Sequence, residues 1–226
     1  MNHPTKKIIC IDPGHGGADP GAVNGGRHEA VDNLRLALAA GYILKQQGHT
    51  AVLTHRGDIP AKSRLLLEAR RRIALESKAD LFISLHRNSF KDPAANGIEI
   101  WIRSAAYAKA AAQVLGQVAA VEHQANRGVK TGNYAVLYNM PMPAMMLELG
   151  FISNAKDNEL FDKHFDGTAA AVAKGILAVL GVPKPEFSSA LYRVQVGAFS
   201  VRENAERLRE ELMSKGYPSF IVKAGA

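Results

Sequence analysis

Short apolar runs alternate with amphipathic helical patterns over most of this chain, and that alternation restricts the fold more than any other feature. The first run, 8–11, is β-branched and is closed by Pro13 and Gly14, as expected of a buried strand. Such alternation is typical of an α/β fold with an open, twisted, mostly parallel sheet and helices on both faces. We predict strands at 8–11, 51–54, 80–86, 98–102, 136–137 and 144–149, helices at 29–47, 61–78, 104–123 and 168–180, a helix start at 153–154 and a loop at 127–133.

A second, shorter unit follows the main one. Residues 184–190 contain Pro and Ser and are typical of a linker. Beyond them the pattern predicts a strand, a helix and a strand, a βαβ half-domain that is short for an independent core. The predicted organisation is a main domain at 1–183, the linker at 184–190 and a C-terminal segment at 191–226, with elements at 191–198, 203–215 and 219–223.

Composition excludes several functional classes. The 226 residues carry a net charge of +7, but no basic run is interleaved with aromatic residues, so nucleic acid is not an expected partner. No apolar stretch is long enough to span a membrane, and residues 1–7 hold no signal-peptide core. We therefore expect synthesis in the cytoplasm and no membrane association. A monomer is the expected oligomeric state. The single cysteine, Cys10, lies within the first strand and is expected to be a buried hydrophobe.

A Gly-rich loop that carries a histidine, residues 12–17, follows the first strand. A dinucleotide-binding pattern counted from Gly14 would need glycine where Asp19 stands, and the Gly-Lys-Ser/Thr of a phosphate loop is absent. Two interpretations remain for His15. It belongs either to an ordinary loop, hydrogen-bonded to its own backbone, or to a catalytic zinc site as its first ligand.

Three metal-binding residue types stand at the ends of predicted elements: His15, Glu29 and His86. Parallel strands deliver the two histidines to one edge of the sheet, and the loop after His15 brings Glu29 back over it. Two imidazoles and a carboxylate form the protein half of a catalytic zinc site. Taken singly, His86 also suits a strand end and Glu29 a helix N-terminus, while His28 is a rival ligand. The other histidines are expected at the surface: His3, His49, His55, His123 and His164.

Glu148 is the most unusual residue of the chain because it ends the apolar run 144–147. Burying a carboxylate there costs free energy unless it has a partner or a chemical role. Near a metal it would serve as a general base toward water. The alternative is a structural ion pair with an arginine.

Together these residues resemble the zinc-dependent N-acetylmuramoyl-L-alanine amidases of the Amidase_3 family. The resemblance covers about residues 7–181 in the family's order, and the tail at 192–218 is similar to the first half of a SPOR peptidoglycan-binding domain. The matching pieces are Ile-Asp-Pro-Gly-His-Gly-Gly at 11–17, Glu29 with Asn33-Leu34, Ser-Leu-His-Arg-Asn-Ser at 84–89, Gly-Ile-Glu-Ile-Trp at 97–101, Arg-Gly-Val at 127–129 and the stretch 142–154.

The resemblance implies that His15, Glu29 and His86 bind zinc and that Glu148 is the catalytic carboxylate. It implies cleavage of the amide between N-acetylmuramic acid and L-alanine of peptidoglycan, with Glu148 taking a proton from the attacking water. The rivals are a zinc peptidase acting on wall stem peptides and a non-catalytic wall-binding module. Without a signal peptide, the expectation is a phage endolysin or a mother-cell amidase that reaches the wall after lysis or release.

Two local features depart from the family pattern. Arg87 follows the second histidine, where such amidases more often carry a small residue; its guanidinium would contact a substrate carboxylate or glycan, or pair with a neighbouring acid. Some relatives also insert a helix that plugs the metal site. Here residues 101–103 run straight into a predicted helix, so we expect an open site.

Overall fold

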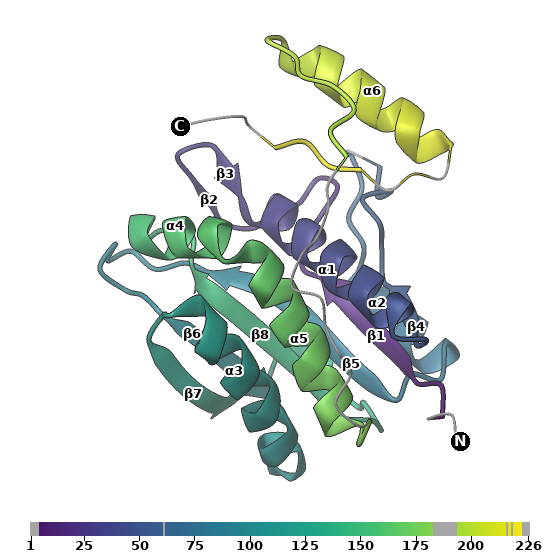
Figure 1. The fold of residues 1–226 in the computed structure, drawn as a ribbon, viewed down its shortest axis with the longest axis vertical. Coiled ribbons are helices and arrows are strands. Elements are labelled where there is room, and N and C mark those ends of the chain that lie inside the picture. Colours follow the sequence, from purple (N-terminus) through teal and green to yellow (C-terminus); the bar gives the residue numbers. More distant parts are fainter. Residues whose placement is uncertain (1–4, 61, 183–193, 216, 218, 223–226) are drawn as a thin grey trace.

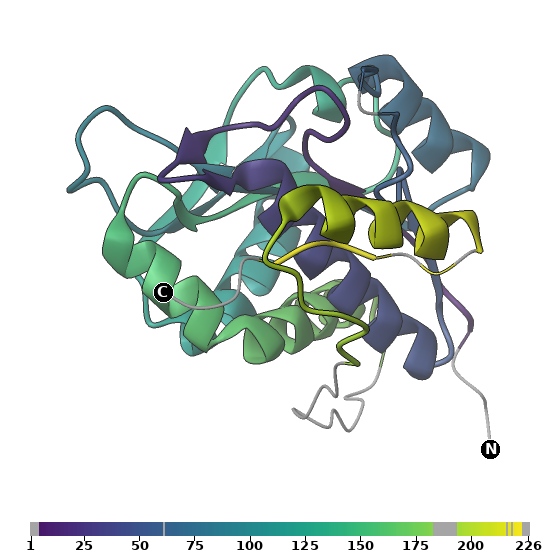
Figure 2. The same ribbon diagram turned by 90° about the horizontal axis from the view of Figure 1, so that it is seen from above.

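The main domain is built on one six-stranded sheet with helices on both faces (Figures 1 and 2). The computed structural model describes residues 5–182 except 61, and residues 194–222 except 216 and 218. Its strand order is β4-β1-β5-β8-β6-β7, and only the β6–β8 pairing is antiparallel. The strands are β1 (Ile8–Pro13), β4 (Thr50–Leu53), β5 (Leu81–Asn88), β6 (Ile98–Ile102), β7 (Asn126–Thr131) and β8 (Ala144–Phe151).

The two faces of the sheet are covered by different elements. Helices α1 (Glu29–Gln46), α3 (Ala108–Glu122) and α5 (Phe165–Val179) pack together over the larger apolar core. Helix α2 (Leu67–Glu76) and the 3₁₀ turn η2 (Ala135–Leu137) cover part of the opposite face, and Figure 2 shows them across the sheet from α1 and α5. Because both faces of β1, β5 and β8 are covered, these strands are almost continuously buried.

The remaining elements lie at the periphery. A two-stranded hairpin, β2 (Val23–Asn24) and β3 (Arg27–His28), leads into α1. The short turn η1 (Ala105–Tyr107) precedes α3, helix α4 (Ala155–Lys163) precedes α5, and Asn154 caps α4 by accepting a hydrogen bond from the amide of Asp157. Helix α6 (Arg202–Ser214) lies above α1 in Figure 1.

The α/β class and the buried strands were predicted correctly, but four local predictions were wrong. The helix expected at 61–78 spans only 67–76, because Ser63 accepts a hydrogen bond from the amide of Ala18 and so belongs to a loop against the Gly-rich segment. The loop expected at 127–133 contains β7, and the strand expected at 136–137 is the turn η2. The last helix begins at Phe165 rather than 168.

In the C-terminal segment, only the helix agrees with the prediction from the sequence. Helix α6 matches the predicted helix at 203–215, but the described residues 194–199 and 219–222 form no strand. The predicted linker at 184–190 and residues 191–193 lie outside the described part. Arg209 of α6 donates a hydrogen bond to the carbonyl of Gly57, which joins the segment to the loop after β4.

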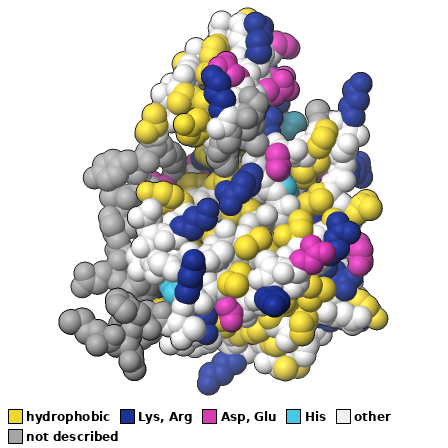
Figure 3. All heavy atoms as spheres, turned by 90° about the vertical axis from the view of Figure 1, so that its right-hand side faces the viewer, with side chains coloured by type: hydrophobic (Ala, Val, Ile, Leu, Met, Phe, Trp, Pro, Cys, Tyr) yellow, Lys and Arg dark blue, Asp and Glu magenta, His cyan; other side chains and the backbone are white. Residues whose placement is uncertain are grey.

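Charge and polarity at the surface follow the composition. Figure 3 shows Lys and Arg side chains scattered over one face of the molecule rather than gathered in a single patch. No described helix combines the length and apolar character needed to cross a bilayer. Cys10 is fully buried in β1, as predicted.

Candidate metal centre and active site

The carboxyl ends of β1 and β5 bring two histidines together. Pro13 of β1 pairs with Leu85 of β5, so the residues that follow reach the same edge of the sheet. The rings of His15 and His86 lie edge to face with their centroids 4.9 Å apart. Glu29, the first residue of α1, places one carboxylate oxygen 3.1 Å from Nε2 of His15 and the other 2.7 Å from Nδ1 of His86.

These three side chains form a compact ligand set. One ligand atom from each of His15, Glu29 and His86 lies within 4.8 Å of the others, a spacing that a single cation can bridge. Nitrogen and oxygen donors of this kind suit zinc. The His–Glu–His grouping predicted from the sequence is therefore present as a geometric cluster. His28 lies at the N-cap of α1 and is not part of it.

Glycines make room for this cluster. A Cβ on Gly14 would lie 2.2 Å from Cε1 of His86, so any side chain there would displace the imidazole. Gly21 has a φ of +66°, and a Cβ on it would lie 2.7 Å from both Glu29 and His15. Glycine is therefore required at these positions because a side chain would occupy the space beside the histidines.

Arg70 and Asp12 hold the loop that carries His15. The Arg70 guanidinium donates to the carbonyl oxygens of Pro13 (2.7 Å) and His15 (2.6 Å) and to Asp12 Oδ1 (2.7 Å). His15 itself has a φ of +66°, a conformation that non-glycine residues seldom adopt. Asp12 also accepts from Thr54 and Ser84, and despite burial, the Arg70 charge and these hydrogen bonds lower the pKa of its carboxyl. We infer that this network fixes the position of His15.

The carboxylates around the histidines set their protonation. Burial lowers the pKa of the His15 imidazole, but the hydrogen bonds and charges of Glu29 and Asp19 outweigh it and raise that pKa to about 9. His86 behaves likewise, since Glu29 and Glu148 raise its pKa against burial. Burial favours a higher pKa for Glu29, but the hydrogen bonds and charges of the two imidazoles outweigh it and lower that pKa. A cation binding here must displace protons from the imidazoles.

Asp19 was missed by the sequence interpretation. Its Oδ2 lies 3.0 Å from Nδ1 of His15, the ring nitrogen that faces away from Glu29, and its Oδ1 accepts from the amide of Gly21. A carboxylate on the far nitrogen of a ligating histidine orients the ring and raises its basicity. The signal that was available is the His-x-x-x-Asp spacing within a glycine-rich turn.

Glu148 lies beside the cluster. Glu148 on β8 is the register partner of His86 on β5, and 9% of its surface is exposed. Its Oε2 is buried with no hydrogen-bond partner in the described part of the chain, and the ion pairs of the described residues do not include it. Desolvation, helped by the charges of Glu29 and Glu99, raises the pKa of Glu148 to about 7 although His86 opposes it. Among the described residues, the structural ion pair with an arginine that was considered from the sequence is not formed.

Arg87 is buried and points away from the cluster. Its Nη1 donates to Asp32 at 2.8 Å and its Nη2 to Asn158 at 2.7 Å, with the guanidinium 4.2 Å from the ring centroid of Phe161. Of the two interpretations considered, pairing with a neighbouring acid is the one observed. Its backbone amide does contact the site, because it donates to Glu29 Oε1.

Two other histidines correct the sequence interpretation. His49 and His55 were expected at the surface, but both are buried. The Nε2 of His55 lies 2.9 Å from the carbonyl of Pro13, so this ring supports the same loop as Arg70. The amide of Lys7 donates to Nδ1 of His49.

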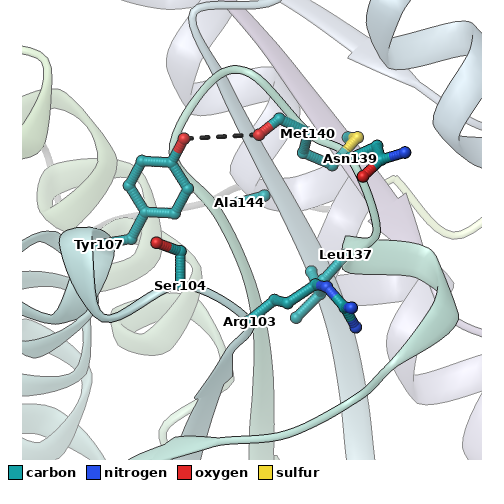
Figure 4. Close-up of a pocket in the computed structure, with 7 residues that line it drawn as sticks. All are labelled: Arg103, Ser104, Tyr107, Leu137, Asn139, Met140 and Ala144. Carbon is teal, nitrogen blue, oxygen red and sulfur yellow. Dashed lines mark hydrogen bonds between the residues drawn. The ribbon is translucent and has the colours of Figure 1, made fainter.

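A pocket elsewhere on the sheet is separate from the cluster. It opens at the other end of β8, around Ala144, four residues and about 13 Å before Glu148. Figure 4 shows the Tyr107 hydroxyl pointing toward the Met140 carbonyl, 3.4 Å away. The lining residues are Arg103, Ser104, Tyr107, Leu137, Asn139, Met140 and Ala144.

A mostly parallel sheet that carries a His–Glu–His cluster and, beside it, a buried glutamate without a hydrogen-bond partner for Oε2 among the described residues is typical of a metal-dependent hydrolytic enzyme of the α/β fold class. The sequence profile of the N-acetylmuramoyl-L-alanine amidase family matches residues 9–178, and that of the SPOR domain matches residues 182–226. The chain therefore belongs to the N-acetylmuramoyl-L-alanine amidase family, and it is a peptidoglycan hydrolase. The resemblance noted from the sequence is confirmed.

Similar proteins agree in sequence and in structure. The chain is 35% identical over 221 residues to the sporulation-specific N-acetylmuramoyl-L-alanine amidase of Bacillus subtilis (strain 168), covering 95% of this chain and 84% of the relative. It is 31% identical over 220 residues to the amidase CwlM of Bacillus licheniformis, with the same coverage. The catalytic domain of CwlV from Bacillus (Paenibacillus) polymyxa var. colistinus has a TM-score of 0.73 and 36% identity, covering 78% of this chain and 99% of that one.

A further solved structure extends the comparison. AmiC2 of Nostoc punctiforme has a TM-score of 0.71 at 33% identity, covering 79% of this chain and 99% of that one. Zinc is typical of this family. The reaction class is that of an amidase, in preference to the peptidase and the non-catalytic module considered from the sequence.

Proposed function

We propose that His15, Glu29 and His86 bind a single zinc ion and that Glu148 is the general base for cleavage of the bond between N-acetylmuramic acid and L-alanine. The observation that carries the proposal is a buried carboxylate, with no hydrogen-bond partner for Oε2 in the described part of the chain, that is the register partner of one member of a compact His–Glu–His set. A zinc ion held there supplies Lewis-acid chemistry toward water and the amide carbonyl.

The chain's own residues divide the remaining work. Glu29 bridges the two imidazoles and Asp19 orients His15, so the three ligands face one point. The Glu148 carboxylate takes a proton from the attacking water and returns it to the departing amine of L-alanine. A pKa near 7 suits both halves of that transfer, because the same group must accept and then donate at neutral pH.

The test uses purified peptidoglycan and the full chain. We expect release of L-alanine amino termini, with mass spectrometry showing intact N-acetylmuramic acid and free stem peptides. Chelation should abolish the release and added zinc should restore it. Glu148→Gln should retain one zinc per chain and lose turnover, whereas His86→Ala should lose both. The matched control is Glu159→Gln, which replaces an exposed glutamate on α4. Full activity of Glu148→Gln would overturn the assigned base.

We propose further that residues 1–183 form the catalytic domain, 184–190 the linker and 191–226 a SPOR-like segment that contacts the wall. The matches of the amidase profile to residues 9–178 and of the SPOR profile to residues 182–226 support a catalytic domain followed by a SPOR-like segment. The chain acts as a monomer, with no nucleic-acid or membrane partner, on a wall made accessible by lysis or release. Similarity to the sporulation-specific relative favours a mother-cell amidase over a phage endolysin. Light scattering and wall-pelleting of the full chain test these points.

A further inference from the structure

A row of polar side chains extends the active-site face of the sheet from β8 to the edge strand. Glu99 of β6 stands directly opposite Glu148 of β8, and Lys130 of β7 stands beside Trp101 of β6. Alternate residues of a strand share a face, so Glu99 and Trp101 lie on the side of Glu148. The intervening residues, Ile98, Ile100 and Ile102, belong to the apolar core on the other face.

Glu99 organises two cations at the end of this row. Its Oε1 accepts from Asn88 (3.2 Å) and Trp101 Nε1 (2.9 Å), and its Oε2 accepts from Arg127 Nε (2.6 Å) and Lys130 Nζ. The acid is buried, with 3% of its side chain exposed. One carboxylate therefore serves two cations, and the group carries a net charge of +1.

Both cations are partly exposed to solvent, although Arg127 Nη1 also donates to the carbonyl of Asn96 (3.1 Å). The side chain of Arg127 is 37% exposed and that of Lys130 is 32% exposed. Each is also held from behind: Arg127 lies 5.0 Å from the ring centroid of Phe151, and Lys130 lies 5.2 Å from that of Trp101. The structure thus fixes two hydrogen-bond donors of positive charge next to the general base.

We propose that Arg127 and Lys130 bind a free carboxylate on the second residue of the stem peptide and so determine which peptidoglycans are cleaved. This inference rests on the proposed function, because it adds a subsite to the same active site. Two charge-assisted donors in a preorganised pair are suited to a carboxylate, and Arg127 favours planar anions in particular.

The distance across the sheet from Glu148 to the two cations fits the second residue of the stem peptide. Neighbouring strands are about 4.8 Å apart, and both cationic groups lean from β7 toward Glu99 on β6. An extended peptide advances about 3.3–3.6 Å per residue. A substrate whose scissile amide lies at Glu148 therefore brings the residue after L-alanine near the cations. Trp101 is covered by Lys130 and by Tyr134, whose ring centroid lies 5.2 Å away, so stacking of a sugar on Trp101 is the weaker alternative.

The experiment compares two synthetic N-acetylmuramoyl peptides that differ only at the second residue, where the α-carboxyl group is either free or a carboxamide. We expect the zinc-loaded full chain to cleave the free acid with a kcat/KM at least about tenfold higher, equivalent to about 1.4 kcal/mol. Lys130→Met and Arg127→Gln should each reduce this ratio, and together they should bring it close to one. Lys130→Arg should restore most of it.

Lys109→Met, which removes an exposed cation from α3 on the other side of the sheet, is the matched control and should keep the wild-type ratio. Zinc content and thermal melting verify that each variant is folded, and Lys130→Met alone decides the point if Arg127→Gln is unstable. Equal cleavage of both substrates by the wild type, or an equal loss on both in the variants, would overturn the subsite while leaving the amidase assignment intact. Cleavage of neither substrate by the wild type would overturn both.

Discussion

Glu148 and His86 are register partners on adjacent parallel strands, and the glutamate keeps one buried carboxylate oxygen without a hydrogen-bond partner among the described residues. A carboxylate in that position destabilises the fold when it is ionised, since burial disfavours its charge. The arrangement is typical of a group retained for chemistry rather than for stability.

Replacing Glu148 with glutamine should therefore stabilise the metal-free protein, by an amount that grows as pH rises above about 4.5 and is complete above about 7. The pKa of Glu148 is about 7 in the folded chain, against 4.5 for the ordinary group. The folded state then binds the proton more tightly than the unfolded state, so stability falls as pH rises from about 4.5 to 7. That cost reaches about 3 kcal/mol above pH 7 and is absent below 4.5.

Urea unfolding of wild type and Glu148→Gln in the presence of chelator, from pH 4 to 8, measures this difference. The two stability curves should converge in acid and separate by the stated amount in alkali. Parallel curves over the whole range would show that Glu148 is not perturbed in this way.

Asp19 is expected to control zinc affinity through His15. Asp19→Asn removes the carboxylate that faces Nδ1 of the ring, and loss of such an outer partner typically weakens metal binding by about 10–100-fold. Asp92→Asn is a matched control, because Asp92 also accepts the amide two residues on but lies in an exposed loop. Competition with a chromophoric chelator gives the two affinities. Unchanged zinc affinity in Asp19→Asn would remove Asp19 from the site.

The sequence predicted the parts of the site that follow from strand topology, and missed the parts that depend on long-range polar contacts. Runs of apolar residues mark β1, β5 and β8 unambiguously, and parallel pairing then brings His15 to His86. Strand β7 was predicted as a loop because its residues, Asn126–Thr131, are largely polar, and its conformation depends on pairing with the edge of β6.

The role of Arg70 was hidden for a related reason. Three arginines stand in succession at 70–72 in a charged helix, and all three suit a solvated face equally well. Only the fold shows that one of them reaches 58 residues back to Asp12, while Arg72 pairs with Glu76 at the surface. Local pattern cannot distinguish neighbouring residues whose partners are remote in sequence.

Removing only the cation of the Arg70–Asp12 pair should destabilise the fold more than removing both charges. Arg70→Met leaves the Asp12 carboxylate buried without its cation, which typically costs about 3–5 kcal/mol. Asp12→Asn combined with Arg70→Met removes the stranded charge and should recover part of that loss. The folded pKa of Asp12 lies below its ordinary value, so in the wild type its contribution is present at neutral pH and is lost as pH falls through that depressed pKa.

In Arg70→Met the same carboxyl is protonated more readily, so the difference from wild type should shrink between pH 7 and pH 4. Urea unfolding at both pH values measures the effect, and Arg72→Met is the matched control at an exposed position. A double variant no more stable than Arg70→Met at pH 7 would contradict a stranded charge as the cause.

Gly14 tests whether the loop is shaped around His86 rather than merely flexible. A Cβ added there would lie 2.2 Å from Cε1 and 2.3 Å from Nε2 of the ring, so Gly14→Ala must move the imidazole away from Glu29. A displacement of about 1 Å at a reacting centre is enough to cost about a hundredfold in rate. We therefore expect Gly14→Ala to lose most of its zinc and at least about a hundredfold in activity.

Gly116 is an exposed helical glycine in α3 with open space around it, so Gly116→Ala should keep full zinc content and gain about 0.5–1 kcal/mol of stability. Zinc analysis of the two purified variants separates the cases, because a general intolerance of alanine would affect both, whereas a steric conflict with His86 affects only the first.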